Sequence, residues 1–108
     1  MTVKRISATE LQQKLEQGKE KPLLLDVREP FEFEIAKISG SLLIPLNQIQ
    51  QRSGELKQAQ EIVVICHHGI RSQQAAEYLV YLGYSKVLNL VGGIDAWSCQ
   101  CDPDIPRY

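Results

Sequence analysis

The sequence predicts an α/β fold in which a parallel sheet is covered by helices on both faces. Two observations indicate this class. Short apolar runs alternate along the chain with segments whose apolar residues recur at helical spacing. The apolar runs are also continuous, as expected of strands buried on both faces, whereas half-exposed strands alternate apolar and polar residues. The length of 108 residues fits one domain, and we expect residues 1–108 to form it.

The first strand and helix are marked by a capping signal. Residues 3–6 are a short strand candidate. Ser7 can cap the helix that follows, and Glu10 stands three residues later, where it completes a capping box. We expect this helix to end at about Gly18.

Four further strands are predicted from apolar runs bounded by turn or breaker residues. Pro22 opens the first of these runs, which we expect to be a central parallel strand, and Pro45 ends the second. A helix is predicted at residues 72–82 because its apolar residues recur at helical spacing, and Gly83 supplies its stop. The four runs occupy residues 23–27, 41–44, 61–65 and 86–90.

The charge balance excludes several classes of partner. The chain has 12 basic and 13 acidic side chains, for a formal net charge of -1, so it carries no sequence-wide basic field to hold nucleic acid or an anionic membrane surface. No run approaches the ~20 apolar residues that span a bilayer, and the first residues lack the apolar core of a signal peptide. We therefore expect a cytoplasmic protein with no nucleic acid and no membrane partner.

A candidate nucleophile follows the most β-branched run of the chain. Cys66 comes directly after residues 61–65, at a strand tip that faces the start of the next helix. Ligands and reactive groups gather at the carboxyl ends of parallel strands, and the positive end of a helix dipole favours a thiolate. Gly69 permits the positive φ that a tight anion-binding loop needs. Arg71 adds a permanent positive charge, directed either at a bound anion or at a carboxylate that braces the loop.

Charged residues after the neighbouring strand are candidates to support this loop. Asp26 and Glu29 are the carboxylates that we expect to brace Arg71. Arg28 has two interpretations. Its guanidinium could hold the oxyanion of a donor such as thiosulfate, or it could be a surface charge paired with Glu29 or Glu32.

The other histidine, cysteine and tryptophan side chains have less defined roles. His67 and His68 either tune the electrostatics of the loop and touch substrate or are solvated bystanders. Cys99 and Cys101 are interpreted as incidental thiols on an extended, exposed segment, with a resolving thiol for the nucleophile as the alternative. Trp97 is expected to fill the core.

Four motifs, in order along the chain, resemble those of the rhodanese-like sulfurtransferases. The loop Cys-His-His-Gly-Ile-Arg-Ser at residues 66–72 is similar to the family's active-site pattern C-x-x-G-x-R followed by Ser or Ala. One departure is Ala36-Lys37, where the family usually has Gly-His before an isoleucine. A second departure is Ser39-Gly40-Ser41, where the family usually has Pro-Gly-Ala. The remaining similarities are D-V-R-x-x-x-E-[YF] at residues 26–33, the I-x-G-A-x-x-I-P part of the family's H-I-x-G-A-x-x-I-P at residues 38–45, and G-G-x-x-A-W at residues 92–97.

The resemblance implies a five-stranded parallel sheet and a sulfurtransferase activity. In that reaction Cys66 receives sulfane sulfur as a persulfide from a small donor, such as thiosulfate or another persulfide. It then passes the sulfur to a thiophilic acceptor, which is cyanide, a thiol or a protein. No cofactor and no metal is required, since loop N–H groups can stabilise the persulfide anion. The residues implied to form the persulfide cradle and to contact substrate are His67, His68, Gly69, Ile70, Arg71 and Ser72.

Three other functions compete with sulfur transfer as explanations of these residues. Non-catalytic or regulatory rhodanese-like binding modules commonly lack the cysteine that this chain keeps. Phosphatases and arsenate reductases of the same fold carry one more residue between Cys and Arg, whereas the four residues between Cys66 and Arg71 suit a single sulfur atom. A zinc site is disfavoured because the adjacent Cys66, His67 and His68 cannot easily converge on one tetrahedral ion.

Overall fold

The computed structural model describes residues 3–18 and 20–108. Met1, Thr2 and Lys19 belong to the predicted domain span but lie outside the described residues. Within the described ranges, no helix combines the length and the apolar character that crossing a membrane requires.

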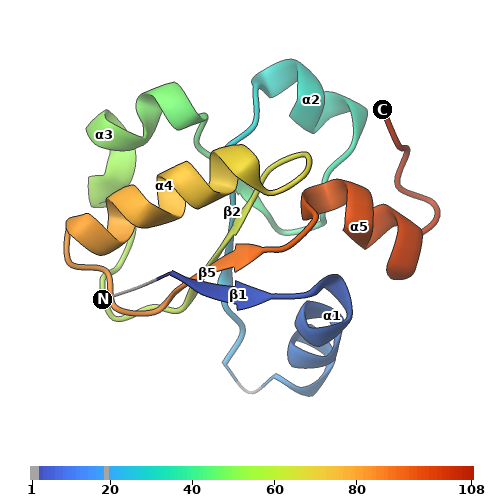
Figure 1. Cartoon of the computed structure of the whole chain (residues 1–108), viewed down its shortest axis with the longest axis horizontal. Helices are drawn as coiled ribbons and strands as arrows, with labels where there is room; N and C mark the ends of the chain where they lie inside the picture. The colour runs from blue at the N-terminus through green and yellow to red at the C-terminus, as the bar shows by residue number, and fades with distance from the viewer. Residues whose placement is uncertain (1–2, 19) are drawn as a thin grey trace.

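Five parallel strands form one sheet, which confirms the predicted fold class (Figure 1). The strand order is β1-β5-β4-β2-β3, so β4 lies at the centre of the sheet. Strand β2, which was expected to be central, lies beside β4 and is paired on both sides. Every strand pairing is parallel. The strands are β1 (Lys4–Ile6), β2 (Leu23–Asp26), β3 (Leu42–Leu43), β4 (Ile62–Ile65) and β5 (Val87–Leu90).

Helices cover both faces of this sheet, because its central strand is apolar on both sides. In β4, Ile62 and Val64 pack in one core cluster, and Val63 and Ile65 pack in the other. The first cluster includes side chains of α3 (Ile49–Arg52) and α4 (Ile70–Tyr81). The second includes side chains of α1 (Ala8–Gln17) and α5 (Gly93–Gln100), among them Trp97, which lies in the core as predicted. Figure 1 shows these two pairs of helices on opposite sides of the strands.

The predicted helix boundaries are close to those of the structure. Ser7 Oγ accepts the Glu10 N–H at 3.1 Å, and the Glu10 carboxylate accepts the Ser7 N–H at 2.9 Å, which confirms the capping box of α1. Helix α4 begins two residues before its predicted start because Gly69 caps it with a φ of 108°. It ends before Gly83, where φ is +104°.

Short elements account for the differences between prediction and structure. The run at residues 41–44 was expected to be a buried strand, but β3 contains only Leu42–Leu43 and is partly exposed, since it lies at an edge of the sheet. Helices α2 (Pro30–Ile35), α3 and α5 were not predicted, because helices of four to eight residues give little periodicity. Two 3₁₀ turns, at Leu46–Gln48 and Ser53–Glu55, flank α3.

Arg28 joins the end of β2 to helix α2 from within the protein. It is fully buried, and its guanidinium bonds both carboxylate oxygens of Asp26, with Nε at 2.9 Å from Oδ1 and Nη2 at 2.7 Å from Oδ2. It also donates to the carbonyl oxygens of Glu32 and Ala36, so the helix wraps around it. Both interpretations of Arg28 were therefore wrong: it is neither a substrate ligand nor a surface charge.

Replacing Arg28 should destabilise the fold strongly. Arg28→Ala would leave the buried Asp26 carboxylate without its charge partner, at a cost of about 3–5 kcal/mol. The free energy of unfolding from urea titration measures this loss. Arg52→Ala, which breaks an exposed ion pair with Glu55, is the matched control and should change stability little. Equal effects of the two substitutions would contradict the central role of Arg28.

Candidate active site

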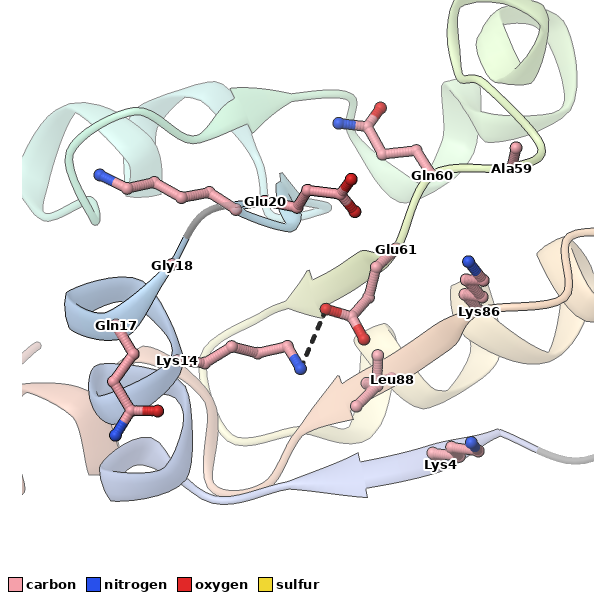
Figure 2. Close-up of a pocket in the computed structure, with 11 residues that line it drawn as sticks. Lys4, Lys14, Gln17, Gly18, Glu20, Ala59, Gln60, Glu61, Lys86 and Leu88 are labelled. Carbon is pink, nitrogen blue, oxygen red and sulfur yellow. Dashed lines mark ion pairs between the residues drawn. The ribbon is translucent and has the colours of Figure 1, made fainter.

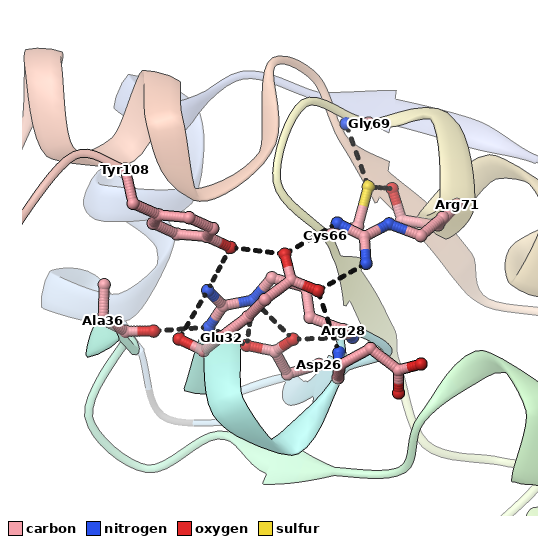
Figure 3. Close-up of polar contacts among 10 residues, drawn as sticks. Asp26, Arg28, Glu32, Ala36, Cys66, Gly69, Arg71 and Tyr108 are labelled. Carbon is pink, nitrogen blue, oxygen red and sulfur yellow. Dashed lines mark hydrogen bonds and ion pairs between the residues drawn. The ribbon is translucent and has the colours of Figure 1, made fainter. Parts of the chain in front are cut away.

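The Cys66 side chain lies at the head of α4, directly after the central strand. The residue is 1% exposed. Its Sγ accepts the backbone N–H of Gly69 at 3.0 Å, and Ser72 Oγ lies 3.2 Å away, within hydrogen-bond distance (Figure 3). Gly69 has the positive φ that the sequence predicted. One backbone N–H and one hydroxyl therefore converge on the sulfur of a helix-capping loop.

Helix α5 holds the other side of this loop. The Ile94 N–H donates to the Cys66 carbonyl at 2.9 Å, and the Asp95 N–H donates to the His67 carbonyl at 3.2 Å. Gly93, the residue before Ile94, lies against the loop with a φ of +60°. A Cβ at this position would lie inside van der Waals contact with both carbonyl oxygens. The close approach of two backbones therefore requires a glycine, a role that the sequence analysis did not assign.

Asn89 supports the loop from strand β5 and was also missed. Its amide accepts the Ser72 hydroxyl proton and donates to the Gly69 carbonyl at 3.1 Å and to Gln73 Oε1 at 3.0 Å. The residue is almost fully buried. A lone amide inside the apolar run Val87–Leu90 was the available signal, because buried polar groups need partners. Asn89 thus fixes the hydroxyl that faces the Cys66 sulfur.

The carboxylate that braces Arg71 is Glu32, on α2. Arg71 Nη1 and Nη2 bond the two carboxylate oxygens at 2.6 and 2.9 Å, and the Glu29 N–H donates to Oε1 at 3.0 Å. The prediction that Asp26 or Glu29 would brace Arg71 was therefore wrong. The Asp26 carboxylate is taken by Arg28, and Glu29 contributes its backbone. The hydrogen bonds from Arg71 lower the pKa of Glu32 to about 2, and Glu32 in turn raises the pKa of Arg71.

The two loop histidines differ in their surroundings. His67 stacks against the ring of Tyr108, with centroids 4.0 Å apart and planes 9° apart, and its other neighbour in the stack is His68 at 4.1 Å. Burial, followed by the charge of His68, lowers the pKa of His67. The side chain of His68 is 61% exposed, with Nδ1 4.0 Å from Asp95 Oδ2. Ile70, which was expected to belong to the persulfide cradle, is 74% exposed.

The segment after α5 is largely exposed, as expected from its prolines, but it bends back toward the site. Ser98 Oγ donates to the Ile105 carbonyl, and Arg107 pairs with Asp95 at 2.9 Å. These contacts carry Tyr108 onto the loop. Cys99 is exposed at the end of α5, and Cys101 is partly buried, which raises the pKa of its thiol.

A separate hollow of about 790 Å³ lies at the opposite end of the strands (Figure 2). It is lined by residues that begin β1, β4 and β5, and the ion pair of Lys14 with Glu61, 3.1 Å long, crosses it. None of the loop residues 66–72 lines it. Residues 3–18 and 20–108 contain no group of three His, Cys, Asp or Glu side chains arranged to hold a metal ion.

Comparison with known proteins finds relatives that match this chain over most of its length. The family model described as "Rhodanese-like domain" matches residues 7–100. A sulfurtransferase of Allochromatium vinosum is 40% identical over 96 residues, which cover 89% of each chain. Rhodanese-like/PpiC domain-containing protein 12 of Arabidopsis thaliana is 38% identical over 112 residues, and there the match spans 98% of this chain but only 38% of the relative.

Solved structures give the same result. The rhodanese-related protein of Thermoplasma volcanium superimposes with a TM-score of 0.84 at 31% identity, covering 97% of this chain and 99% of the other. The rhodanese-like domain protein of Staphylococcus aureus superimposes with a TM-score of 0.85 at 28% identity, covering 98% and 99%.

Two glycine substitutions should separate backbone strain from steric conflict. Gly69→Ala forces a non-glycine residue to a φ of +108°, with the new Cβ in ordinary van der Waals contact and no atom closer than Gly92 N at 3.4 Å, at a cost of about 1–3 kcal/mol. Gly93→Ala adds a collision with the carbonyl oxygens of Cys66 and His67, and should lower stability further. Urea unfolding of the two variants measures both losses. A Gly93→Ala variant as stable as Gly69→Ala would mean that the loop and α5 can separate without cost.

The pairing of Glu32 with Arg71 should appear in the pH dependence of stability. Because the folded state lowers the pKa of Glu32 from 4.5 to about 2, its stabilisation is fully present above the ordinary value and is lost as the pH falls through this window. Glu32→Gln should lower stability at neutral pH and flatten the profile between pH 4.5 and 2. Urea unfolding across this range provides the measurement. Glu34→Gln, an exposed site on the same helix, should keep the wild-type profile.

Proposed function

Because the chain belongs to the rhodanese-like domain family, we propose that it transfers sulfane sulfur through a persulfide on Cys66. Sulfur transfer in general is supported by its sulfurtransferase relatives. The observation that carries the finer proposal is the position of the Cys66 sulfur, with the Gly69 N–H at 3.0 Å and Ser72 Oγ at 3.2 Å. We take residues 1–108 as one domain, and place the reaction in the cytoplasm, since a reducing compartment keeps the thiol available.

The first half of the reaction loads the sulfur. The Cys66 thiolate attacks the outer sulfur of a donor such as thiosulfate, a new S–S bond forms, and the donor's S–S bond breaks. Sulfite leaves with the electron pair of that bond, and the terminal sulfur of Cys66 carries the negative charge. The Gly69 N–H supplies a hydrogen bond to the attacking sulfur, and the start of α4 favours the anion. Ser72 Oγ lies 3.2 Å from the sulfur while its proton is donated to Asn89 Oδ1.

The second half of the reaction transfers the sulfur from Cys66 to an acceptor. An acceptor nucleophile, which is cyanide, a thiol or a thiol of a partner protein, attacks the terminal sulfur. The S–S bond to Cys66 breaks, and its electron pair returns to Sγ, so that the thiolate is regenerated and no external oxidant or reductant is used. Cys66 is only 1% exposed, so a donor with a small terminal sulfur atom can approach its thiolate more readily than a donor with a bulky group. The same burial limits the access of water to the persulfide. No step in this scheme uses a metal or a cofactor.

The supporting residues have indirect roles in this proposal. Arg71 is about one-third exposed and is held by Glu32, so it presents a fixed positive group at the end of the loop for an anionic donor. Asn89 orients Ser72, and Arg28 with Asp26 fixes the position of α2, which carries Glu32.

Intact-mass measurement tests the proposal directly. Reduced protein exposed briefly to thiosulfate should gain the mass of one sulfur atom, which peptide mapping should place on Cys66. Cyanide should then remove it as thiocyanate. Cys66→Ser should lose both the adduct and the turnover, while the fold remains because the side-chain volume is similar.

The other two thiols provide the matched control. A variant with both Cys99→Ser and Cys101→Ser should keep the sulfur adduct and nearly the wild-type rate, since neither thiol belongs to the loop. A sulfur adduct that persists in Cys66→Ser would overturn the assignment of the carrier. Failure to load sulfur from both thiosulfate and a small persulfide, together with hydrolysis of a phosphate ester, would favour a phosphatase instead.

A further inference from the structure

The hydroxyl of Tyr108 lies between two charged groups of the site. It accepts a hydrogen bond from Arg28 Nη1 at 2.7 Å and donates one to Glu32 Oε2 at 2.8 Å (Figure 3). Burial raises the pKa of Tyr108 to about 12, so the hydroxyl keeps its proton and remains a donor. Figure 3 shows the Tyr108 ring above the Arg28 guanidinium, with its hydroxyl between that group and the Glu32 carboxylate.

This contact completes the coordination of the Glu32 carboxylate. Oε1 accepts from Arg71 Nη1 and from the Glu29 N–H, and Oε2 accepts from Arg71 Nη2 and from Tyr108. Each oxygen therefore has one bond to Arg71 and one to a second donor. Two donors on each side hold the carboxylate plane in place, and this plane sets the direction of the Arg71 guanidinium.

The ring of Tyr108 contacts the loop independently of its hydroxyl. It stacks on His67, the residue directly after Cys66, with centroids 4.0 Å apart and planes 9° apart. The Arg28 guanidinium carbon lies 5.7 Å from the centroid of the same ring. Tyr108 is thus linked to both ends of the loop: its ring contacts His67 directly, and its hydroxyl binds Glu32, which in turn binds Arg71.

We propose that Tyr108 is a positioning residue for sulfur transfer: its hydroxyl aligns the Glu32–Arg71 pair, and its ring holds His67 beside the nucleophile. The inference rests on the proposed function, but its two structural parts are measurable without any sulfur donor. Two contacts hold the segment that carries Tyr108 against α5: the ion pair of Arg107 with Asp95, and the hydrogen bond from Ser98 Oγ to the Ile105 carbonyl. These contacts fix the position of the Tyr108 side chain.

Two substitutions separate the hydroxyl from the ring. Tyr108→Phe removes the bond to Glu32 and keeps the stack on His67, whereas Tyr108→Leu removes both. Tyr81→Phe removes a hydroxyl from an exposed tyrosine on α4 and serves as the matched control. Urea unfolding confirms that each variant is folded before the other measurements are made.

Nuclear magnetic resonance reads the two contacts separately. Rotation about the Nε–Cζ bond of Arg71 should be faster in Tyr108→Phe than in the wild type, because the carboxylate that holds both Nη groups loses a donor. The titration of His67 should stay in place in this variant and should move toward the ordinary value in Tyr108→Leu, as the ring no longer buries it. The groups whose charges act on His67 are His68, Asp95, Glu32 and Arg71, and all of them remain in both variants. The Tyr108 phenol is lost in both, but its pKa of about 12 keeps it neutral where His67 titrates, so its loss removes no charge.

Kinetics complete the test. With thiosulfate, Tyr108→Phe should lower kcat/KM by about 3- to 10-fold, the size expected for weakening one bond to a charged group that acts through another residue. The loss should be larger in Tyr108→Leu, and Tyr81→Phe should match the wild type. Wild-type kinetics in Tyr108→Phe, or an unmoved His67 titration in Tyr108→Leu, would overturn the positioning role. If the wild type takes up no sulfur, the proposed function fails, while the Arg71 and His67 signals still decide whether Tyr108 positions them.

Discussion

The loop after the central strand depends on how its backbone oxygens are bound. The carbonyls of Cys66 and His67 accept N–H groups from the first turn of α5, and the Gly69 carbonyl accepts the amide of Asn89. With these oxygens held from outside the loop, the Gly69 N–H can face the Cys66 sulfur. Buried backbone groups are costly when unpaired, so the loop keeps this orientation only while β5 and α5 stay in place. The site therefore depends on elements that lie far from Cys66 in the sequence.

A series of hydrogen-bonded side chains, four of them charged, connects the end of β2 to this loop. Asp26 binds Arg28, Arg28 donates to Tyr108, Tyr108 donates to Glu32, and Glu32 binds Arg71. Charges buried in this way are tolerated because each one has a partner of opposite sign or a hydrogen-bonding group. Two members of this series reach solvent: Arg71, whose side chain is 34% exposed, and Tyr108, which is 38% exposed. The arrangement fixes α2 on the sheet and leaves one cationic group at the mouth of the loop.

Parts of this site could be predicted from the sequence, and the reason is local. Cys66 follows an apolar run and precedes a helix, and Gly69 supplies the left-handed residue at that junction, so both are determined by neighbours a few residues away. Arg28 was misjudged because a charge next to a strand is usually exposed. Its burial depends on α2, which is too short to show a periodic pattern.

The sequence by itself determined the alternation of strands and helices, the two-sided burial of β4 and the place of Cys66 at its end, because apolar periodicity and capping act over a few residues. Only the tertiary structure decided which carboxylate meets Arg71, which amide meets Ser72 and which ring covers His67. Glu32 is 39 residues from Arg71, and Tyr108 is 76 residues from Glu32. Partners at such separations are selected by the strand order and by the return of the segment after α5, and several carboxylates in the sequence satisfy the local pattern equally well.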